Sequence, residues 1–293
     1  LPDLVLESDA SLTGWGARCG LLSTGGSWSE MECSLHINCL EMLAGLFAIQ
    51  SFAKNRVSCS ILLRMDNRAA VRYLNHRGGT RSESLANLAV TLWEFCLPRK
   101  LSVTAEYLPG SLNTLADWWS RNSRDSSDWR LHVSVFKALS SIFGEMSLDL
   151  FASCTNFQIP KFFSWRPDPL ALATDAFLQV WPPSLLYAFP PFNLIARILS
   201  HVRIQRSSLV LITPFWPSQT WFPSCLELSS DCPILLPSFP ELLLNPVGLC
   251  HDLVTLSSLS LLAWRISGLP GEPQEFRRKL STSSNSLDRK SVV

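Results

Sequence analysis

The sequence spaces four acidic residues along the first part of the chain in a pattern suited to binding metal ions: Asp9, Glu41, Asp66 and Asp117. Asp9 and Asp66 each end a short apolar run that is typical of a buried strand. If these two strands are neighbours in a sheet, their ends bring both carboxylates to one spot, which Glu41 reaches from a covering helix. The four residues are therefore a candidate cluster of acids.

The chemistry of such a cluster follows from its charge. Packed carboxylates repel one another, and their pKa values rise unless cations neutralise them. A donor set made only of oxygen atoms favours Mg²⁺, for which Mn²⁺ substitutes. Two such ions about 4 Å apart activate a water on one side of a phosphodiester and stabilise the leaving oxygen on the other. Taken singly, each acid also suits an ordinary position at a strand end, helix cap or first helical turn.

The elements around these acids predict a mixed α/β domain. We expect strands at residues 4–9, 14–21, 26–30, 59–66 and 102–108, and helices at 38–54, 67–77, 80–96 and 114–120. Residues 23–26, with two glycines, predict the turn before the third strand. The sequence TRSE at 80–83 predicts a capping box that opens the third helix.

Composition narrows the class of protein. The 293 residues are 47% hydrophobic and 17% charged, enough for a core in one or two domains, and the net charge of +1 gives no basic field. Nine cysteines without a C-x-x-C pair predict free thiols in a reducing compartment, hence an intracellular, cytoplasmic or nuclear protein that is not secreted. No apolar run reaches the ~20 residues of a membrane helix. The start on Leu1, without Met or a signal peptide, predicts a fragment of a longer polypeptide.

Domain borders follow from a change in polarity along the chain. The polar stretch RNSRDSSD at 121–128 predicts a boundary, and the alternating apolar and proline-rich segments after it predict a second, smaller α/β unit. We expect a first domain at 1–122, a linker with a connecting helix at 123–146, a second domain at 147–266 and a disordered polar tail at 267–293.

Four segments of the first domain resemble a known family: SDASLTGWGA, HINCLEMLAGLFAI, LLRMDNRAAVRYLNHRGGTRS and YLPGSLNTLADWWSR. They resemble, in family order, the ribonuclease H domain of retroelement polymerases, most closely that of DIRS-type tyrosine-recombinase retrotransposons. The resemblance covers about residues 3–122 and implies a ribonuclease H-like mixed sheet flanked by helices. The loop YLPGSLN departs from many family members because it holds no histidine, which predicts slower turnover.

The same resemblance implies an activity. The four acids match the family's catalytic metal ligands, so that two Mg²⁺ ions would serve hydrolysis of the RNA strand in RNA–DNA hybrids. It implies two partners, the hybrid itself and the reverse transcriptase domain of the same polyprotein. Donors for sugar hydroxyls and phosphates follow Asp66 in the chain. These candidate nucleic-acid-binding residues are Asn67, Arg68, Arg72, Asn75, Arg77, Thr80 and Arg81, for which a solvated helix face is the alternative interpretation.

The second domain resembles another family. The segments LDLFASCTNFQIPKFFSW, TDAFLQVW, LLYAFPPFNLIARIL and LVLITPFWPSQTWF resemble the Dam-like adenine methyltransferase region of DIRS-type elements. In that family an Asp/Asn-Pro-Pro-aromatic loop binds the target amine through its polar residue and stacks the aromatic residue on a flipped base. Here the loop is Phe189-Pro190-Pro191-Phe192, a degenerate form in which a phenyl ring replaces the amine-binding group.

Two alternative functions stay open at this point. The first is a DNA N6-adenine methyltransferase-like activity with S-adenosylmethionine as cofactor, against which Phe189 argues because a buried amine would lose its hydrogen-bond partner. The second is a catalytically decayed module that only binds nucleic acid.

Overall fold

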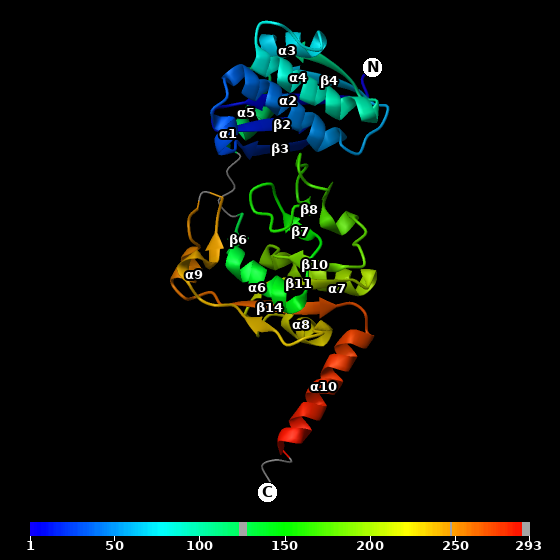
Figure 1. The fold of residues 1–293 in the computed structure, drawn as a ribbon, viewed down its shortest axis with the longest axis vertical. Coiled ribbons are helices and arrows are strands. Elements are labelled where there is room, and N and C mark those ends of the chain that lie inside the picture. Colours follow the sequence, from blue (N-terminus) through cyan, green and yellow to red (C-terminus); the bar gives the residue numbers. More distant parts are fainter. Residues whose placement is uncertain (123–127, 247, 289–293) are drawn as a thin grey trace. The chain divides into compact units, whose positions relative to one another are not determined.

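The computed structural model describes residues 1–122, 128–246 and 248–288, and the chain divides into two compact units (Figure 1). The first unit comprises Leu1–Asp125 and Arg166–Ala171, and the second comprises Ser126–Trp165 and Leu172–Val293. Residues 123–127 of the predicted linker and residues 289–293 of the predicted tail lie outside the described residues.

The first unit is built on a five-stranded mixed sheet in the order β3-β2-β1-β4-β5. Its strands are β1 (Leu4–Ala10), β2 (Gly14–Cys19), β3 (Leu22–Ser27), β4 (Ser60–Met65) and β5 (Ser102–Tyr107). β1, β2 and β3 form an antiparallel meander, whereas β4 lies parallel to both β1 and β5. The predicted mixed α/β fold class is confirmed, and the parallel pairing brings the carboxyl ends of β1 and β4 to the same edge of the sheet.

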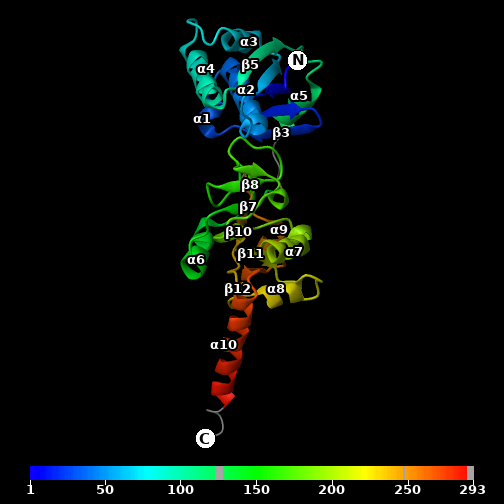
Figure 2. The same cartoon turned by 90° about the vertical axis from the view of Figure 1, so that its right-hand side faces the viewer.

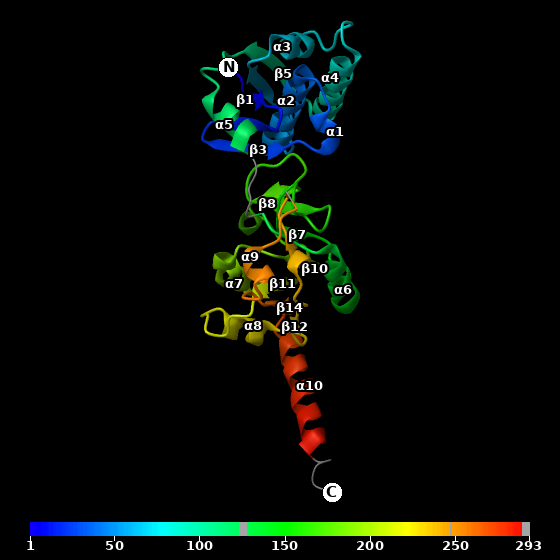
Figure 3. The same cartoon turned by 90° about the vertical axis from the view of Figure 1, so that its left-hand side faces the viewer.

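Helices cover both faces of this sheet. They are α1 (Glu30–Cys33), α2 (Ile37–Ala53), α3 (Arg68–Asn75), α4 (Glu83–Cys96), the 3₁₀ turn η1 (Leu97–Arg99) and α5 (Thr114–Asn122). α2 packs on β1 and β2 from the same side as α4, and α5 packs on β2 and β3 from the other (Figures 2 and 3). Small residues let α2 approach closely, since a Cβ atom on Gly45 would lie 2.8 Å from the Met65 Cε atom.

The turn predicted at residues 23–26 is wrong, because these residues lie inside β3. The chain reverses at Gly20, whose φ of +59° suits a glycine in a tight turn. The two later glycines serve packing instead. A Cβ atom on Gly25 would lie 2.7 Å from the Trp15 carbonyl oxygen, and one on Gly26 would lie 2.6 Å from the Trp15 ring nitrogen.

The capping box predicted at residues 80–83 is also wrong in its position. Ser82 is the N-cap of α4, and its hydroxyl accepts a hydrogen bond from the Leu85 amide at 3.3 Å. The Tyr73 hydroxyl accepts a hydrogen bond from the Ser82 amide at 2.7 Å, and the helix begins two residues later than the sequence pattern suggests. Thr80 stays exposed in this loop.

The second unit contains a seven-stranded sheet in the order β12-β14-β11-β10-β7-β8-β9, so it is not the smaller of the two. Neighbours from β9 to β11 pair in parallel, and β14 is antiparallel to both β11 and β12. The strands are β7 (Asp149–Ala152), β8 (Phe162–Ser164), β9 (Ala173–Thr174), β10 (Leu185–Ala188), β11 (Ser208–Pro214), β12 (Ile234–Leu235) and β14 (Leu261–Ser267), with a separate pair β6 (Arg130–Leu131) and β13 (Leu243–Leu244).

Two hydrophobic cores lie on opposite faces of this second sheet. Along β11, Leu209 and Leu211 belong to the core under α7 and α8, whereas Val210 and Ile212 belong to the core under α6 (Figures 2 and 3). This alternation is what a strand buried on both faces requires. The helices and turns are α6 (Val133–Phe143), η2 (Ala176–Leu178), η3 (Phe192–Leu194), α7 (Ile195–Gln205), α8 (Phe222–Leu228), η4 (Pro240–Leu242), α9 (Asp252–Thr255) and α10 (Gly271–Asp288).

Most of the polar tail predicted to be disordered is helical, as α10. An ion pair of 2.8 Å joins Glu275 and Lys279 one turn apart, and the Arg277 guanidinium donates to the Glu227 carbonyl oxygen at 2.6 Å. Charged residues with good helix propensity support a helix without an apolar face, which the composition rule for disorder overlooks. Among the described residues, no helix combines the length and apolar character needed to cross a membrane.

Candidate metal centre

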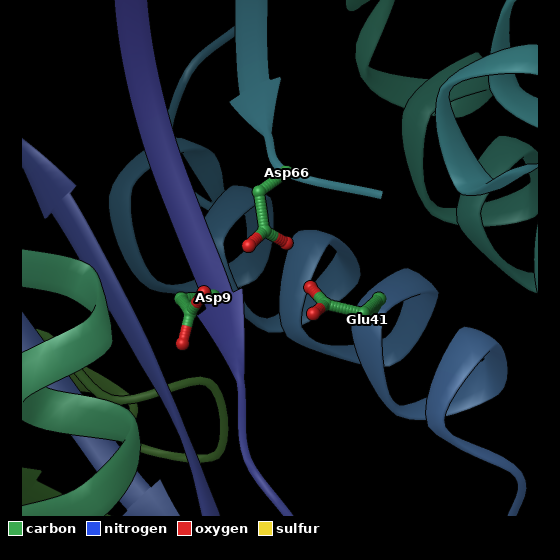
Figure 4. A group of neighbouring side chains, drawn as sticks. All are labelled: Asp9, Glu41 and Asp66. Atoms are coloured by element: carbon green, nitrogen blue, oxygen red, sulfur yellow. The ribbon is translucent and has the colours of Figure 1, made fainter. Parts of the chain in front are cut away.

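Three carboxylates meet where β1 and β4 end (Figure 4). Asp9 is the penultimate residue of β1, and Asp66 directly follows β4, whose last residue pairs with Ser8 of β1. Glu41 points toward them from the N-terminal part of α2. One oxygen atom from each carboxylate lies within 4.8 Å of the others. The predicted convergence of these three acids is therefore present in the structure.

Burial makes this cluster electrostatically unfavourable without a cation. Asp9 and Glu41 are each only 4% exposed. Burial, with the nearby charges of Asp9 and Asp66, raises the pKa of Glu41 to about 9. Burial also raises the pKa of Asp9 to about 6, against the opposing effect of a hydrogen bond from Ser120. Among the described residues, the buried Glu41 Oε2 atom has no hydrogen-bond partner.

These observations fit a divalent cation. An oxygen-only donor set suits Mg²⁺ or Mn²⁺, and a buried carboxylate oxygen without a donor gains a partner when a cation binds. The residues that would hold the cation are Asp9, Glu41 and Asp66.

Asp117 lies outside this group of three. Its Oδ1 atom accepts hydrogen bonds from the Arg121 side chain one turn later on α5, with a shortest distance of 2.7 Å, and its side chain is 40% exposed. The charge of Asp117 nevertheless contributes to the raised pKa of Asp9. Its role as a fourth metal ligand stays a prediction from the sequence.

Two of the predicted nucleic-acid-binding residues hold the fold of the first unit together. The Asn67 side chain caps α3 by accepting from the Ala70 amide at 3.0 Å, and it donates to the Asn38 side chain at 2.9 Å. Asn75 joins α3 to β5, because its side-chain amide donates to the Ala105 carbonyl oxygen and accepts from the Ala105 amide. Their polar atoms are thus already engaged in structural hydrogen bonds.

The remaining candidates are exposed: Arg68, Arg72, Arg77, Thr80 and Arg81. Arg68 starts α3 two residues after Asp66, and its guanidinium lies 4.4 Å from the centre of the Tyr107 ring. Arg77 lies 5.2 Å from the centre of the Trp93 ring. Stacking on aromatic rings orders an arginine while its remaining donors stay available to solvent or a phosphate.

The sequence predicts Asn113 as the N-cap of the helix at 114–120 but does not predict the contacts that Asn113 and Ser120 make with β1. The Ser120 hydroxyl donates to Asp9 Oδ2 at 2.8 Å, and the Asn113 side chain donates to the Ser8 carbonyl oxygen at 2.8 Å. Both residues are fully buried. The signal was their helical spacing from Asp117, since Ser120 follows it by three residues and Asn113 precedes it by four.

The Pro-Pro loop of the second unit follows β10 and borders a small cavity. Trp129, Leu131, Asp149 and Tyr187 join Phe189 around a cavity of about 10 Å³, whereas sites for molecules of cofactor size span about 300–1,000 Å³. The Asp128 carboxylate accepts from Thr155 Oγ1 at 2.9 Å, which ties down the loop after β7. The cavity beside Phe189 is thus much smaller than a site for a molecule the size of S-adenosylmethionine.

The first unit is thus an α/β domain with a cluster of carboxylates at the ends of its central strands. The chain matches no protein-family profile and no curated protein in sequence. It is similar in structure to the N-terminal ribonuclease H domain of a Mycobacterium tuberculosis protein, solved as a fusion with maltose binding protein (17% identity, TM-score 0.36, covering 42% of this chain and 94% of that one).

Two further solved structures resemble the chain to a comparable degree. LC11-RNase H1 in complex with an RNA/DNA hybrid is 16% identical, with a TM-score of 0.33 and coverage of 40% of this chain and 93% of that one. RNase H1 from the halophilic archaeon Halobacterium salinarum NRC-1 is 15% identical, with a TM-score of 0.34 and coverage of 41% and 94%. Because the identities and TM-scores are this low, any conclusion about function has to rest on the acidic residues of the candidate metal centre.

Proposed function

We propose that the first unit is a metal-dependent ribonuclease H that hydrolyses the RNA strand of RNA–DNA hybrids. The observation that carries the proposal is the convergence of Asp9, Glu41 and Asp66 from a strand, a helix and a second strand, with a buried Glu41 oxygen that lacks a partner among the described residues. The four ribonuclease H-like sequence segments support the choice of substrate.

In this proposal the acidic side chains hold the metal and the arginine side chains contact the substrate. Asp9, Glu41 and Asp66 would hold the metal, and Asp117 would complete the set from α5. Mg²⁺ bound at this site would supply the chemistry of an activated water and of charge stabilisation at the leaving oxygen of a phosphodiester. Arg68 and Arg72 carry positive charge along α3, which begins two residues after Asp66, and in this proposal they would contact the phosphates that flank the scissile bond.

The test compares the native chain with Asp66→Asn on a hybrid labelled in its RNA strand, with Mg²⁺ present. We expect cleavage by the native chain and a loss of about 100- to 1,000-fold in the variant, because the metal contributes several kcal/mol of transition-state stabilisation. Glu106→Gln, which breaks only a surface ion pair with Arg64, is the matched control and should cleave normally. Absence of cleavage by the native chain, or equal cleavage by Asp66→Asn, would contradict the proposal.

The retroelement origin belongs to the same proposal. The order and spacing of the four segments support a piece of a DIRS-type polyprotein, in which the reverse transcriptase domain would deliver the hybrid. No observation on the second unit favours adenine methylation, since the loop lacks the amine-binding residue and the adjacent cavity does not fit the cofactor.

A further inference from the structure

Ser120 is a buried residue of α5 whose side chain contacts the cluster of acids at Asp9. Its side chain has no exposed surface, and its hydroxyl lies 2.8 Å from Asp9 Oδ2 and 2.9 Å from the Asp117 carbonyl oxygen. Its own carbonyl oxygen accepts from the Ser11 hydroxyl at 2.6 Å, just beyond β1. Ser120 is therefore held from both its side chain and its main chain at the end of β1.

The contact depends on a close approach of α5 to the sheet. Gly16 of β2 pairs with Asp9, and a Cβ atom at Gly16 would lie 2.0 Å from the Ala116 carbonyl oxygen and 2.7 Å from the Ser120 amide nitrogen. Only a residue without a side chain leaves α5 near enough for a short serine side chain to reach Asp9.

The Ser120 hydroxyl supplies a hydrogen-bond donor to the Asp9 carboxylate. Asp9 shares its surroundings with the carboxyl groups of Glu41 and Asp66, since one oxygen atom from each of the three lies within 4.8 Å of the others. Ionised neighbours at this distance repel the charge of Asp9. Among the described residues, Ser120 is the side chain that donates a hydrogen bond to Asp9. A charge-assisted bond of this kind limits the rotation of a carboxylate and fixes the direction of its lone pairs.

Building on the proposed function, we propose that Ser120 is a positioning residue that orients the Asp9 carboxylate for metal binding. It acts through Asp9 and does not touch the hybrid, because it is fully buried. Hydrogen-bond partners of metal ligands commonly change metal affinity or activity by about 10- to 100-fold when they are removed.

The experiment titrates the metal-free full chain with Mn²⁺ by calorimetry and by the electron paramagnetic resonance signal of the free ion. We expect Ser120→Ala to bind Mn²⁺ about 10- to 100-fold more weakly than the native chain. In hybrid cleavage we expect the variant to lower kcat and to leave KM for the hybrid unchanged. Ser120→Cys, which keeps the size of the side chain but donates weakly, should show an intermediate loss.

Ser51→Ala is the matched control. Ser51 is also a buried helical serine of the first unit, its hydroxyl has no partner among the described residues, and it lies in α2 away from the acids' oxygens. It should bind Mn²⁺ as the native chain does. Native-like Mn²⁺ affinity in Ser120→Ala would overturn the positioning role, whereas a native chain that neither binds Mn²⁺ nor cleaves hybrid would refute the proposed function instead.

Discussion

At the scale of single residues, the acids make the metal-free protein sensitive to pH. The pKa of Glu41 rises from an ordinary 4.5 to about 9, and that of Asp9 from 3.8 to about 6. A carboxyl group whose pKa is higher in the folded state favours folding below its unfolded pKa, and this contribution is lost as the pH rises through the folded pKa. We therefore infer that the free energy of unfolding of the metal-free first unit falls between about pH 4 and pH 9.

Replacing Glu41 by glutamine should remove most of this dependence. In the presence of a chelator we expect Glu41→Gln to match the native chain near pH 4.5. At pH 8 we expect it to exceed the native free energy of unfolding by about 3–5 kcal/mol, because each pH unit between the unfolded and the folded pKa of Glu41 costs about 1.4 kcal/mol. Urea unfolding followed by circular dichroism measures the difference. The exposed Glu94→Gln on α4 serves as control, and a native pH profile in Glu41→Gln would show that repulsion at Glu41 is not the cause.

At the scale of elements, glycines in β2 and β3 decide how closely α5 can pack. Gly16 faces the α5 main chain at Ala116 and Ser120, and Gly25 faces both the Trp15 carbonyl oxygen and the Trp119 Cβ atom. Both glycines lie inside strands, where glycine costs conformational entropy without packing a side chain of its own. Their presence is explained by the close contact that brings α5, with Asp117 and Ser120, to the end of β1.

Gly16→Ala should therefore push α5 away from the sheet. We expect a loss of about 3 kcal/mol in the free energy of unfolding, because the new Cβ atom overlaps main-chain atoms that cannot rotate away, and a parallel loss of hybrid cleavage. Gly20→Ala in the same hairpin meets no atom within 4 Å but has a φ of +59°, so it should cost only about 1–2 kcal/mol and leave cleavage intact. Equal effects of the two substitutions in urea unfolding would argue against this packing role.

At the scale of the whole molecule, the chain returns to the first unit after it has entered the second. Arg166–Ala171 belongs to the first unit, although the residues on both sides of it belong to the second. The Lys54 ammonium, at the end of α2, donates to the carbonyl oxygens of Asp168, Pro169 and Ala171, and burial lowers its pKa. This short segment therefore supplies a late part of the first unit.

A chain that ends at Asn122 lacks these partners of Lys54. Its hydrophobic core is complete, because the residues of that cluster all precede Glu106, so we expect it to fold. Lys54→Met should cost about 1–3 kcal/mol of the free energy of unfolding in the full chain, where it removes hydrogen bonds to a charged donor, and nothing or a small gain in the shortened chain. Thermal unfolding of the full and the shortened chain, each with and without Lys54→Met, measures these costs. An equal cost of Lys54→Met in both chains would show that residues 166–171 do not stabilise the first unit through Lys54.

Local patterns in the sequence determined the elements and the three central acids. Apolar runs ending at Asp9 and Asp66, and the helical spacing of Glu41, each depend on neighbours within a few residues, so the strands, the helix and their meeting point could be predicted. Local rules were wrong where a distant contact competed with them. Residues 23–26 contain turn-forming glycines but pack inside β3, and most of residues 267–293 form α10 although their composition is typical of disorder.

Only the tertiary structure decided how the polar side chains are used. Asn67 and Asn75 were candidates for contacting nucleic acid, yet their amides bind Asn38 and the Ala105 main chain, which lie far away in sequence. The Ser120 hydroxyl donates a hydrogen bond to Asp9, which lies more than a hundred residues earlier in the chain. A polar group forms hydrogen bonds with whatever the fold brings within about 3 Å, and periodicity in the sequence does not encode that partner. The sequence by itself therefore determined which acids are present and on which elements, and the packing of α5 and α2 determined which groups surround them.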